Sequence, residues 1–243
     1  EDATSVEIAP NSSYSNGAVL TLRGLNTVTA SDVCVLIGAK EGAGKYDDAT
    51  TEGGNLKPGA FKTAIKSTNV QGNSNYIFLL FDHIYSALNF KVKVDADYAQ
   101  LRTIRLKEMT LQPKSGSDNH YDKANVTVTL TATTDGTSPI TNVTYTPSGT
   151  STKAPQLFKS TEAAGTVLTT EAQNIRGCFT PAGITSFVLK STYDVYDRKG
   201  NLIRPNQTAE NTIDISKLFT TSSAITRGKM FTVNMTIQPT YLY

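Results

Sequence analysis

Histidine is the side chain most often used for acid–base chemistry near neutral pH, and this chain has two, His83 and His120. Asp82 directly precedes His83 and could orient its imidazole for proton transfer. His120 lies in a polar segment where the pattern gives it no partner. No Ser-His-Asp or Cys-His set can be assembled around either histidine. We therefore predict a packed or capping role for His83, no catalytic residues and no enzymatic activity.

The segment GAKEGAGKY, residues 38–46, invites comparison with a phosphate-binding loop because it is rich in glycine and lysine. A P-loop has four residues between its first glycine and the Gly-Lys pair, which is followed by Ser or Thr. Here five residues separate Gly38 from Gly44, and Tyr46 replaces the hydroxyl residue. No amphipathic helix follows to present its N-terminus to a phosphate. The sequence therefore predicts a long surface loop over residues 38–59, and no nucleotide or other cofactor.

Cysteine and carboxylate side chains are too scattered along the sequence to indicate a metal site. Cys34 and Cys178 are far apart, and neither has a histidine at the spacing of a zinc site. We interpret them as two buried thiols that pack as small hydrophobic groups, with a disulfide between them as the alternative. Asp194 and Asp197 lack the alternating carboxylates of a calcium loop. The sequence thus predicts no metal ligands.

Composition restricts the kinds of partner that the chain can bind. The 243 residues carry a net charge of +2, with basic and acidic residues mixed along the chain. Because no basic stretch could follow a phosphate backbone, we expect no nucleic-acid partner. Hydrophobic residues make up 38% of the chain, which is enough for a packed core. No signal peptide or transmembrane run is evident, which does not make the protein cytoplasmic, since a chain can begin after its targeting segment.

The elements that would position any site are predicted to be β-strands, and residues 76–113 carry the strongest pattern. Residues 77–81 form an unbroken apolar run, which we expect to be a strand covered on both faces. Asp82 is then predicted to cap a helical turn over residues 83–87.

The next part of this stretch switches to a period of two. Residues 88–95 alternate apolar and polar side chains, which indicates a half-buried strand. Asp95 is expected to cap a short turn. In the following strand, residues 104–111, the apolar positions change phase at Lys107–Glu108, which predicts a β-bulge there. Further on, the turn residues of Asp197–Gly200 predict a hairpin.

Domain organisation is indicated by the polar segment 113–123, which contains several turn formers and almost no apolar side chain. We therefore predict one domain over residues 1–112 and a second over residues 113–243. Many short strands, frequent turns and almost no helical periodicity predict an all-β chain of two antiparallel β-sandwich domains with only short helical turns. In the last strand, residues 230–237, four apolar side chains alternate with polar ones and are predicted to face the core: Phe231, Val233, Met235 and Ile237.

Three stretches together resemble the fimbrillin-like family of Bacteroides-type bacteria, the surface pilins and adhesins related to FimA-type major fimbrial subunits. The most telling pieces are an H-I-x-x-A-L-x-F entry into an alternating strand and a closing I-x-P-T-Y-L-Y. The three stretches are residues 82–111, 193–215 and 227–243, roughly a third of the chain.

The resemblance implies an exported protein that is anchored in the outer membrane through a lipid on its precursor, loses an N-terminal segment and polymerises at the cell surface. It also implies two β-sandwich domains of transthyretin-like, Greek-key topology, in which one subunit donates a strand to a groove of its neighbour. Carried onto this chain, the first strand, with Val6 and Ile8, would be the segment displaced at assembly. The last strand would lie closest to the donor, with Phe231, Val233, Met235 and Ile237 as its apolar side chains.

One departure from the family concerns the C-terminal end. Relatives often continue beyond the equivalent of residues 239–243, where this chain stops. Either the chain has been cut, or this member lacks the donor extension and ends a fibre. No arginine processing site can be matched in the first residues.

The implied function is a fimbrial (pilus) subunit or cell-surface adhesin without catalysis. Its expected partners are other pilin subunits, bound by strand donation, and surface proteins or glycans of a host or of another bacterium. The alternative is a cell-surface glycan-binding β-sandwich module. Sugar sites commonly present exposed aromatic side chains, foremost Trp, which this chain lacks. Three tyrosines near predicted loops keep this alternative open: Tyr46, Tyr121 and Tyr145.

Overall fold

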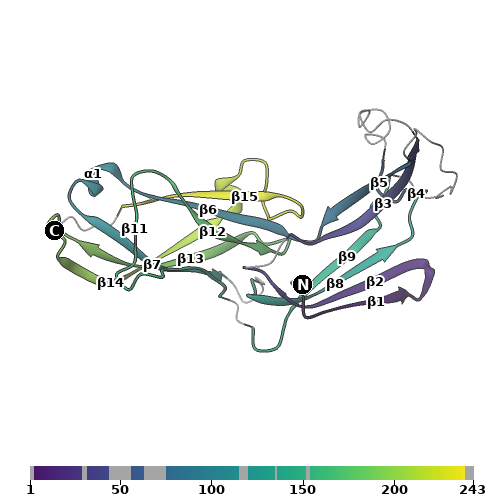
Figure 1. Ribbon diagram of the computed structural model, residues 1–243, viewed down its shortest axis with the longest axis horizontal. Coiled ribbons are helices and arrows are strands. Elements are labelled where there is room, and N and C mark those ends of the chain that lie inside the picture. The colour runs from purple at the N-terminus through teal and green to yellow at the C-terminus, as the bar shows by residue number, and fades with distance from the viewer. Residues whose placement is uncertain are drawn as a thin grey trace.

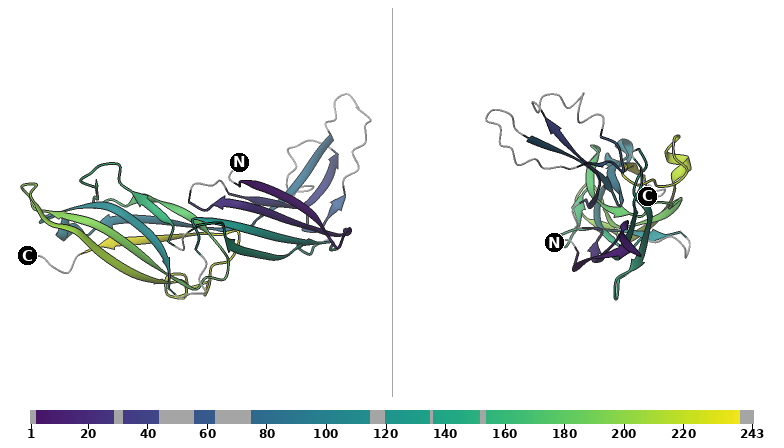
Figure 2. Two further views of the ribbon diagram at one scale, coloured as in Figure 1. Left: turned by 90° about the horizontal axis from the view of Figure 1, so that it is seen from below. Right: turned by 90° about the vertical axis from the view of Figure 1, so that its right-hand side faces the viewer.

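The computed structural model describes residues 3–28, 32–43, 56–62, 75–114, 120–134, 136–151 and 154–238. The described chain is an all-β protein of two sandwiches that lie end to end in an elongated molecule (Figure 1). Figure 2 shows the same arrangement from below and from one end. Neither helix in the described ranges has the length and apolar character needed to cross a membrane.

The first sandwich, beside the N-terminus, has a four-stranded and a three-stranded sheet. The four-stranded sheet has the order β1-β2-β8-β9: Ser5–Asn11, Ser13–Asn26, Lys123–Thr131 and Ile140–Pro147. The three-stranded sheet has the order β4-β3-β5: Phe61–Lys62, Cys34–Ala43 and Asn75–His83. The buried residues between the sheets form one cluster: Leu22, Leu25, Val35, Ile84, Tyr85, Tyr121, Ala124, Val126 and Val128.

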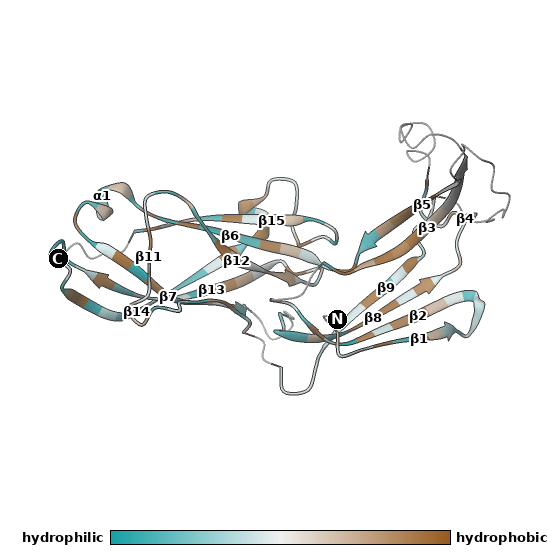
Figure 3. Cartoon of the chain, viewed as in Figure 1, coloured by the Kyte–Doolittle hydropathy of each residue, from teal (hydrophilic) through white to brown (hydrophobic). Residues whose placement is uncertain are grey.

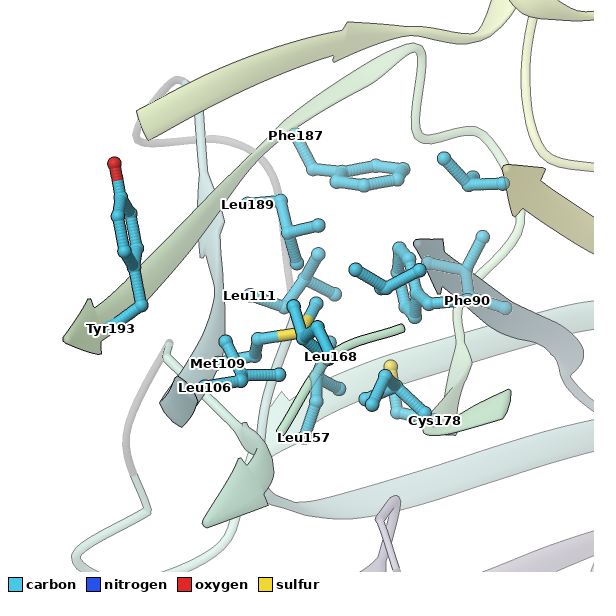
Figure 4. Packing of buried hydrophobic residues seen from close by; sticks show 14 of the residues in the cluster. Phe90, Leu106, Met109, Leu111, Leu157, Leu168, Cys178, Phe187, Leu189 and Tyr193 are labelled. Carbon is cyan, nitrogen blue, oxygen red and sulfur yellow. The ribbon is translucent and has the colours of Figure 1, made fainter. Parts of the chain in front are cut away.

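The second sandwich is built around the larger core. One sheet has the order β10-β7-β13-β14, with β11 (Thr166–Val167) also paired to β7: Gln156–Lys159, Thr103–Pro113, Ser186–Tyr196 and Leu202–Asp214. The other has the order β12-β6-β15: Gln173–Thr180, Ser86–Val94 and Met230–Ile237. Helices α1 (Ala96–Ala99) and α2 (Ile215–Leu218) are single turns. Figure 4 shows the side chains that fill this core, including Phe90, Leu111 and Phe187.

The strand pairing does not follow the expected division at residues 112 and 113. β8 and β9 lie beyond that point in the sequence, yet β8 pairs with β2 in the first sandwich. β6 and β7 precede it, yet they pair with β12, β13 and β15 in the second sandwich. The polar segment 113–123 is therefore a connection that returns the chain to the first sandwich. Its polar composition suggested exposure throughout, but His120 and Tyr121 are buried, and composition does not indicate which strands lie together.

The crossing from the first sandwich to the second differs from the predicted helical turn. β5 continues to His83 and β6 begins at Ser86, so only Ile84 and Tyr85 separate the strands. Both of these residues are buried in the first core. The capped turn over residues 83–87 was therefore a wrong prediction, because the chain makes only a bend at this buried apolar pair before β6 begins.

The prediction that β5 is covered on both faces is wrong. Ile77, Leu79 and Phe81 are 46%, 50% and 52% exposed, while the intervening Phe78 and Leu80 are partly buried. Hydrophobic residues follow β3 and β5 outward along this sheet (Figure 3). An unbroken apolar run thus marks a strand here, but one face of that strand remains open to solvent.

Several local predictions are confirmed. β6 alternates buried and less buried residues over its whole length. Asp95 caps α1, since its Oδ1 accepts hydrogen bonds from the backbone N–H groups of Asp97 and Tyr98 at 3.1 and 3.0 Å. The register of β7 against β13 shifts so that Lys107 is an extra residue, which is the predicted bulge. The hairpin of β13 and β14 turns at Asp197–Gly200.

Candidate functional site

The first candidate assembly strand, β1, is an edge strand of the four-stranded sheet. Among the described strands it pairs only with β2, in an antiparallel register that places Val6 opposite Leu22 and Ile8 opposite Leu20. Cross-strand partners share one face of a sheet. Leu22 is buried in the first core, whereas Val6 and Ile8 are 58% and 62% exposed. β1 therefore carries apolar side chains on the core-facing side without burying them.

The ion pair between β1 and β2 contributes little to the stability of their pairing. Arg23 donates two hydrogen bonds to Glu7, at 3.3 and 3.0 Å, and both side chains are at least half exposed. The arginine lowers the pKa of Glu7 through these hydrogen bonds and its charge. Exposed pairs of this kind are screened by water and contribute little to stability. Backbone hydrogen bonds to β2 are thus the main attachment of β1.

The second candidate assembly strand, β15, is part of the second core. It lies at the edge of its sheet and runs parallel to β6. Phe231 and Val233 are buried, and Met235 and Ile237 are partly buried against the core. The predicted alternation is present, since Asn234 and Thr236 are exposed. The ring of Phe231 also packs edge-on against Phe219, with centroids 5.0 Å apart.

An open groove of about 470 Å³ lies between the last part of β15 and the two strands β13 and β14. Its walls mix apolar and polar side chains, which include Tyr193, Ala209, Asn211, Ile213, Met235 and Ile237. The exposure of Met235 and Ile237 follows from this opening. These two positions therefore depend less on burial than Phe231 and Val233 do.

We expect Val233→Ala to lower the free energy of unfolding by about 2 kcal/mol, because it deletes two buried methyl groups from the second core. Thr236→Ala, an exposed change on the same strand, should alter it by less than about 0.5 kcal/mol. Denaturant unfolding of both variants measures the difference. Equal effects of the two substitutions would contradict the alternation of β15.

The structure brings Asp32 and Cys34, two positions apart in the sequence, next to His83. Cys34 and His83 are cross-strand partners at the start of β3 and the end of β5. His83 Nδ1 lies 2.6 Å from Asp32 Oδ2 and 3.3 Å from Cys34 Sγ. The register between β3 and β5, two strands far apart in the sequence, creates this cluster, and the apolar run 77–81 indicated only one of the two strands.

This cluster is not an acid–base site oriented by Asp82, as the sequence had allowed. Asp82 instead binds Arg227 of the segment before β15, with 2.6 Å between Oδ2 and the guanidinium nitrogen. The donor atoms of Asp32, Cys34 and His83 lie within 4.8 Å of one another, and in the described ranges they are the one such group of three. The pKa of the Cys34 thiol is raised, which opposes the thiolate that a metal needs. The absence of metal ligands therefore stays a prediction.

The other residues considered for chemistry have structural environments. His120 is buried, with its Nδ1 3.1 Å from Thr180 Oγ1 and its ring edge-on to Phe187. Asp197 accepts hydrogen bonds from the backbone N–H groups of Lys199 and Asn201 and from the Asn201 amide, which lower the pKa of its carboxyl. These bonds hold the hairpin turn, in which an aspartate side chain is common.

The loop predicted from residue 38 begins later than expected. β3 continues through Ala43 and pairs with β5 over that whole length, so the first part of GAKEGAGKY is strand. Gly38 also fits closely at this position, because a Cβ there would lie 2.9 Å from the carbonyl oxygen of Lys57. Residues 44–46, including Tyr46, lie outside the described residues.

The two described tyrosines of the glycan-binding alternative do not form an exposed platform. Tyr121 is buried in the first core. Tyr145 is partly buried, its ring lies 5.2 Å from that of Tyr85, and its hydroxyl donates to the carbonyl of Ile84. Burial raises the pKa of Tyr145 to about 12, although the Arg227 charge opposes this. Both rings serve the first core and its junction with the second sandwich.

The cysteines are not paired with each other, and only Cys178 is buried as predicted. We expect iodoacetamide to modify Cys34 and to spare Cys178 in the folded protein. Burial raises the pKa of the Cys178 thiol to about 12 and also blocks access to it. Partial burial and the charges of Asp32 and Asp82 raise the pKa of Cys34, so its labelling should accelerate as the pH rises above neutral.

Timed labelling followed by peptide mass spectrometry checks this expectation. Asp32→Asn is the matched variant, because removing that carboxylate should speed the labelling of Cys34 at neutral pH. Labelling of both cysteines at one rate in the folded protein would contradict the assigned burial.

Comparison with known proteins finds a likeness in solved structures only. No protein-family model matches the chain, and no curated protein matches it. A candidate cell adhesion protein from Bacteroides uniformis aligns over 90% of this chain and 66% of its own, with 15% identity and a TM-score of 0.31. A fimbrial protein from Bacteroides vulgatus aligns over 96% and 67%, with 13% identity and a TM-score of 0.34.

The chain thus spans about two thirds of the length of each of these structures. At such TM-scores and identities neither likeness carries a functional assignment.

Proposed function

We propose that the chain is a fimbrial subunit or cell-surface adhesin that acts by strand-mediated assembly and surface interaction, without catalysis. The proposal includes export and attachment to the outer membrane through a lipid on the precursor. Its sequence support is the set of three family-like stretches, 82–111, 193–215 and 227–243. Its structural support is the weak attachment of β1.

β1 has the properties of a strand that a neighbouring subunit could replace. It lies at a sheet edge, and Val6 and Ile8 remain more than half exposed although they are on the core-facing side. A replacement strand would form the same main-chain hydrogen bonds to β2. Larger or better placed apolar side chains on it would bury more surface over Leu20 and Leu22, which favours exchange. This difference in burial is the observation that carries the proposal.

In this proposal the last strand, β15, is not the strand that is donated. Phe231 and Val233 fill the chain's own second core, so removing β15 to serve another subunit would expose both side chains. We therefore assign donation to a segment next to β15, and β15 itself to the folded subunit. Met235 and Ile237, at the open groove, are the members of the predicted set that remain available for contact with a neighbour.

The test is to place a protease site in the connection at Ser12, between β1 and β2, where φ is +63°. After cleavage, we expect β1 to dissociate and the chains to form polymers, as measured by size-exclusion chromatography and electron microscopy. The uncut protein should stay monomeric, and an excess of a synthetic peptide of residues 1–12 should suppress assembly. Cleaved protein that retains β1 and stays monomeric would overturn the proposal. Selective binding to a glycan array by such protein would instead favour a glycan-binding module.

A further inference from the structure

Three polar side chains converge across the large sheet of the second sandwich: Lys107 on β7, Asp194 on β13 and Asn206 on β14. β13 lies between the other two strands. Lys107 Nζ is 2.8 Å from Asn206 Oδ1 and 3.3 Å from Asp194 Oδ2. The backbone N–H of Asn206 donates to Asp194 Oδ1 at 2.6 Å. The Lys107 amine thus contacts both the side-chain amide oxygen of Asn206 and the carboxylate of Asp194, and that carboxylate also accepts a hydrogen bond from the backbone of Asn206.

Among the acidic residues whose burial the structure describes, Asp194 is unusual because its side chain is buried although it does not point into the core. Its neighbours Tyr193 and Val195 point into the core, so by alternation Asp194 points to the opposite face of the sheet. It is nevertheless only 3% exposed. Side chains from the flanking strands must therefore cover this carboxylate, and Lys107 and Asn206 contact it directly.

Irregular backbone on both flanking strands produces this convergence. Lys107 is the extra residue of the bulge in β7. β14 shifts register on the other side of Asp194, between Gln207 and Arg204, and Asn206 has a φ of +49°. Bulges commonly re-aim a side chain, and a positive φ is uncommon for residues other than glycine, although asparagine adopts it more readily than most. An exposed lysine–aspartate pair would require neither feature.

We propose that Lys107 and Asn206 form an intramolecular amide bond, with Asp194 as the group that carries the protons. Asp194 first takes a proton from the Lys107 ammonium, which leaves a neutral amine. The amine nitrogen attacks Asn206 Cγ, and Asp194 relays a proton from the attacking nitrogen to the departing amide nitrogen. The Cγ–Nδ2 bond breaks as the Nζ–Cγ bond forms. One ammonium ion is released in total, so atoms and charge balance and no oxidant, metal or cofactor is consumed.

Lys107 Nζ lies 2.8 Å from Asn206 Oδ1, the oxygen bonded to the Cγ that it would attack, so the two groups are already adjacent. Attack requires the amine to move from this oxygen onto Cγ, at the approach of about 3–3.5 Å that is typical of near-attack geometry. The bond would join β7 to β14 across β13, and so link the first and last of three adjacent strands. Such a link would tie the sheet together against unfolding and against pulling forces. This inference stands on the second sandwich alone and does not depend on the assembly role proposed for β1.

The intact mass of the purified protein tests the proposal. We expect it to be lower than the sequence mass by one ammonia molecule, in full or increasingly on incubation at mildly alkaline pH. Trypsin should then fail to cut after Lys107, and should release one branched peptide that joins residues 106–114 to residues 200–217. Deamidation of Asn206 would instead raise the mass slightly, so the two modifications are distinguishable.

Three variants sharpen the result. Asp194→Asn keeps the side-chain shape but cannot take the proton, and should abolish the loss of ammonia. Lys107→Arg should abolish it as well, while Lys190→Arg, which alters a separate pair with Glu210 between β13 and β14, should leave it unchanged. Wild-type protein of unaltered mass after incubation, with normal cleavage after Lys107, would overturn the proposal. An ammonia loss that maps to any other peptide, or that persists in Asp194→Asn, would overturn it too.

Discussion

Phe187→Ala is expected to lower the free energy of unfolding of the second sandwich by about 3–5 kcal/mol. Phe187 is fully buried on β13, and its ring meets Phe90 of the opposite sheet edge-on, with centroids 6.2 Å apart. His120, from the connection that leads back to the first sandwich, packs against the same ring at 5.8 Å. The substitution therefore leaves a cavity where both sheets and this connection meet, and it removes two aromatic contacts.

Denaturant unfolding measures this effect, and Lys190→Ala on the same strand is the control. Lys190 pairs with Glu210 on the surface, so its removal should change the free energy of unfolding by no more than about 1 kcal/mol. If the two sandwiches unfold in separate transitions, Phe187→Ala should move the one that belongs to the second sandwich. An effect below about 1 kcal/mol would show that Phe187 is not the centre of this core.

Features that depend on neighbouring residues could be predicted from the sequence. The alternation of residues 88–95 identified β6, because the period of side chains along a strand is a local property. The cap at Asp95 follows from a side chain that reaches the backbone two and three residues on. The phase change at Lys107 revealed a bulge, since one inserted residue reverses the facing of all that follow.

Features that depend on which strands meet could not be predicted in the same way. The polar segment 113–123 looked like a domain boundary, but the chain had already entered the second sandwich at Ser86. Likewise, the run 77–81 predicted a strand correctly and its coverage wrongly, because coverage depends on the second layer. Strand pairing over long sequence distances decides both questions, and one sequence contains little signal for it.

The candidate sites show the same division. The exposed apolar pair Val6 and Ile8 was visible as a short alternating segment, whereas its position at a sheet edge comes from the pairing with β2. The Lys107–Asp194–Asn206 contacts join residues from three strands, and up to 99 positions separate them in the sequence. A bulge on β7 was predicted. That this bulge brings Lys107 into contact with Asn206 could not be, because the contact depends on the pairing of β14 with β13.

Gly177→Ala is expected to destabilise the second sandwich by about 3 kcal/mol or more. Gly177 lies on β12 at a register shift between Ile175 and Cys178, where this strand passes close to β6. A Cβ at this position would lie 1.7 Å from the carbonyl oxygen of Leu88 and 2.8 Å from its carbonyl carbon. Because these are backbone atoms of a central strand, no rotation of a side chain relieves the overlap, and the two strands would have to separate.

Gly183→Ala is the matched control for this prediction. A Cβ at Gly183 would meet nothing within 4 Å, but its φ of +90° still disfavours alanine. That change should therefore show only the conformational part of the effect, about 1–2 kcal/mol. Denaturant unfolding, together with the soluble yield of each variant, measures the difference between the two. A Gly177→Ala protein no less stable than Gly183→Ala would mean that β12 and β6 are further apart than their pairing indicates. If Gly177→Ala loses clearly more free energy of unfolding than Gly183→Ala, the close approach of β12 to β6 requires a residue without a side chain at position 177.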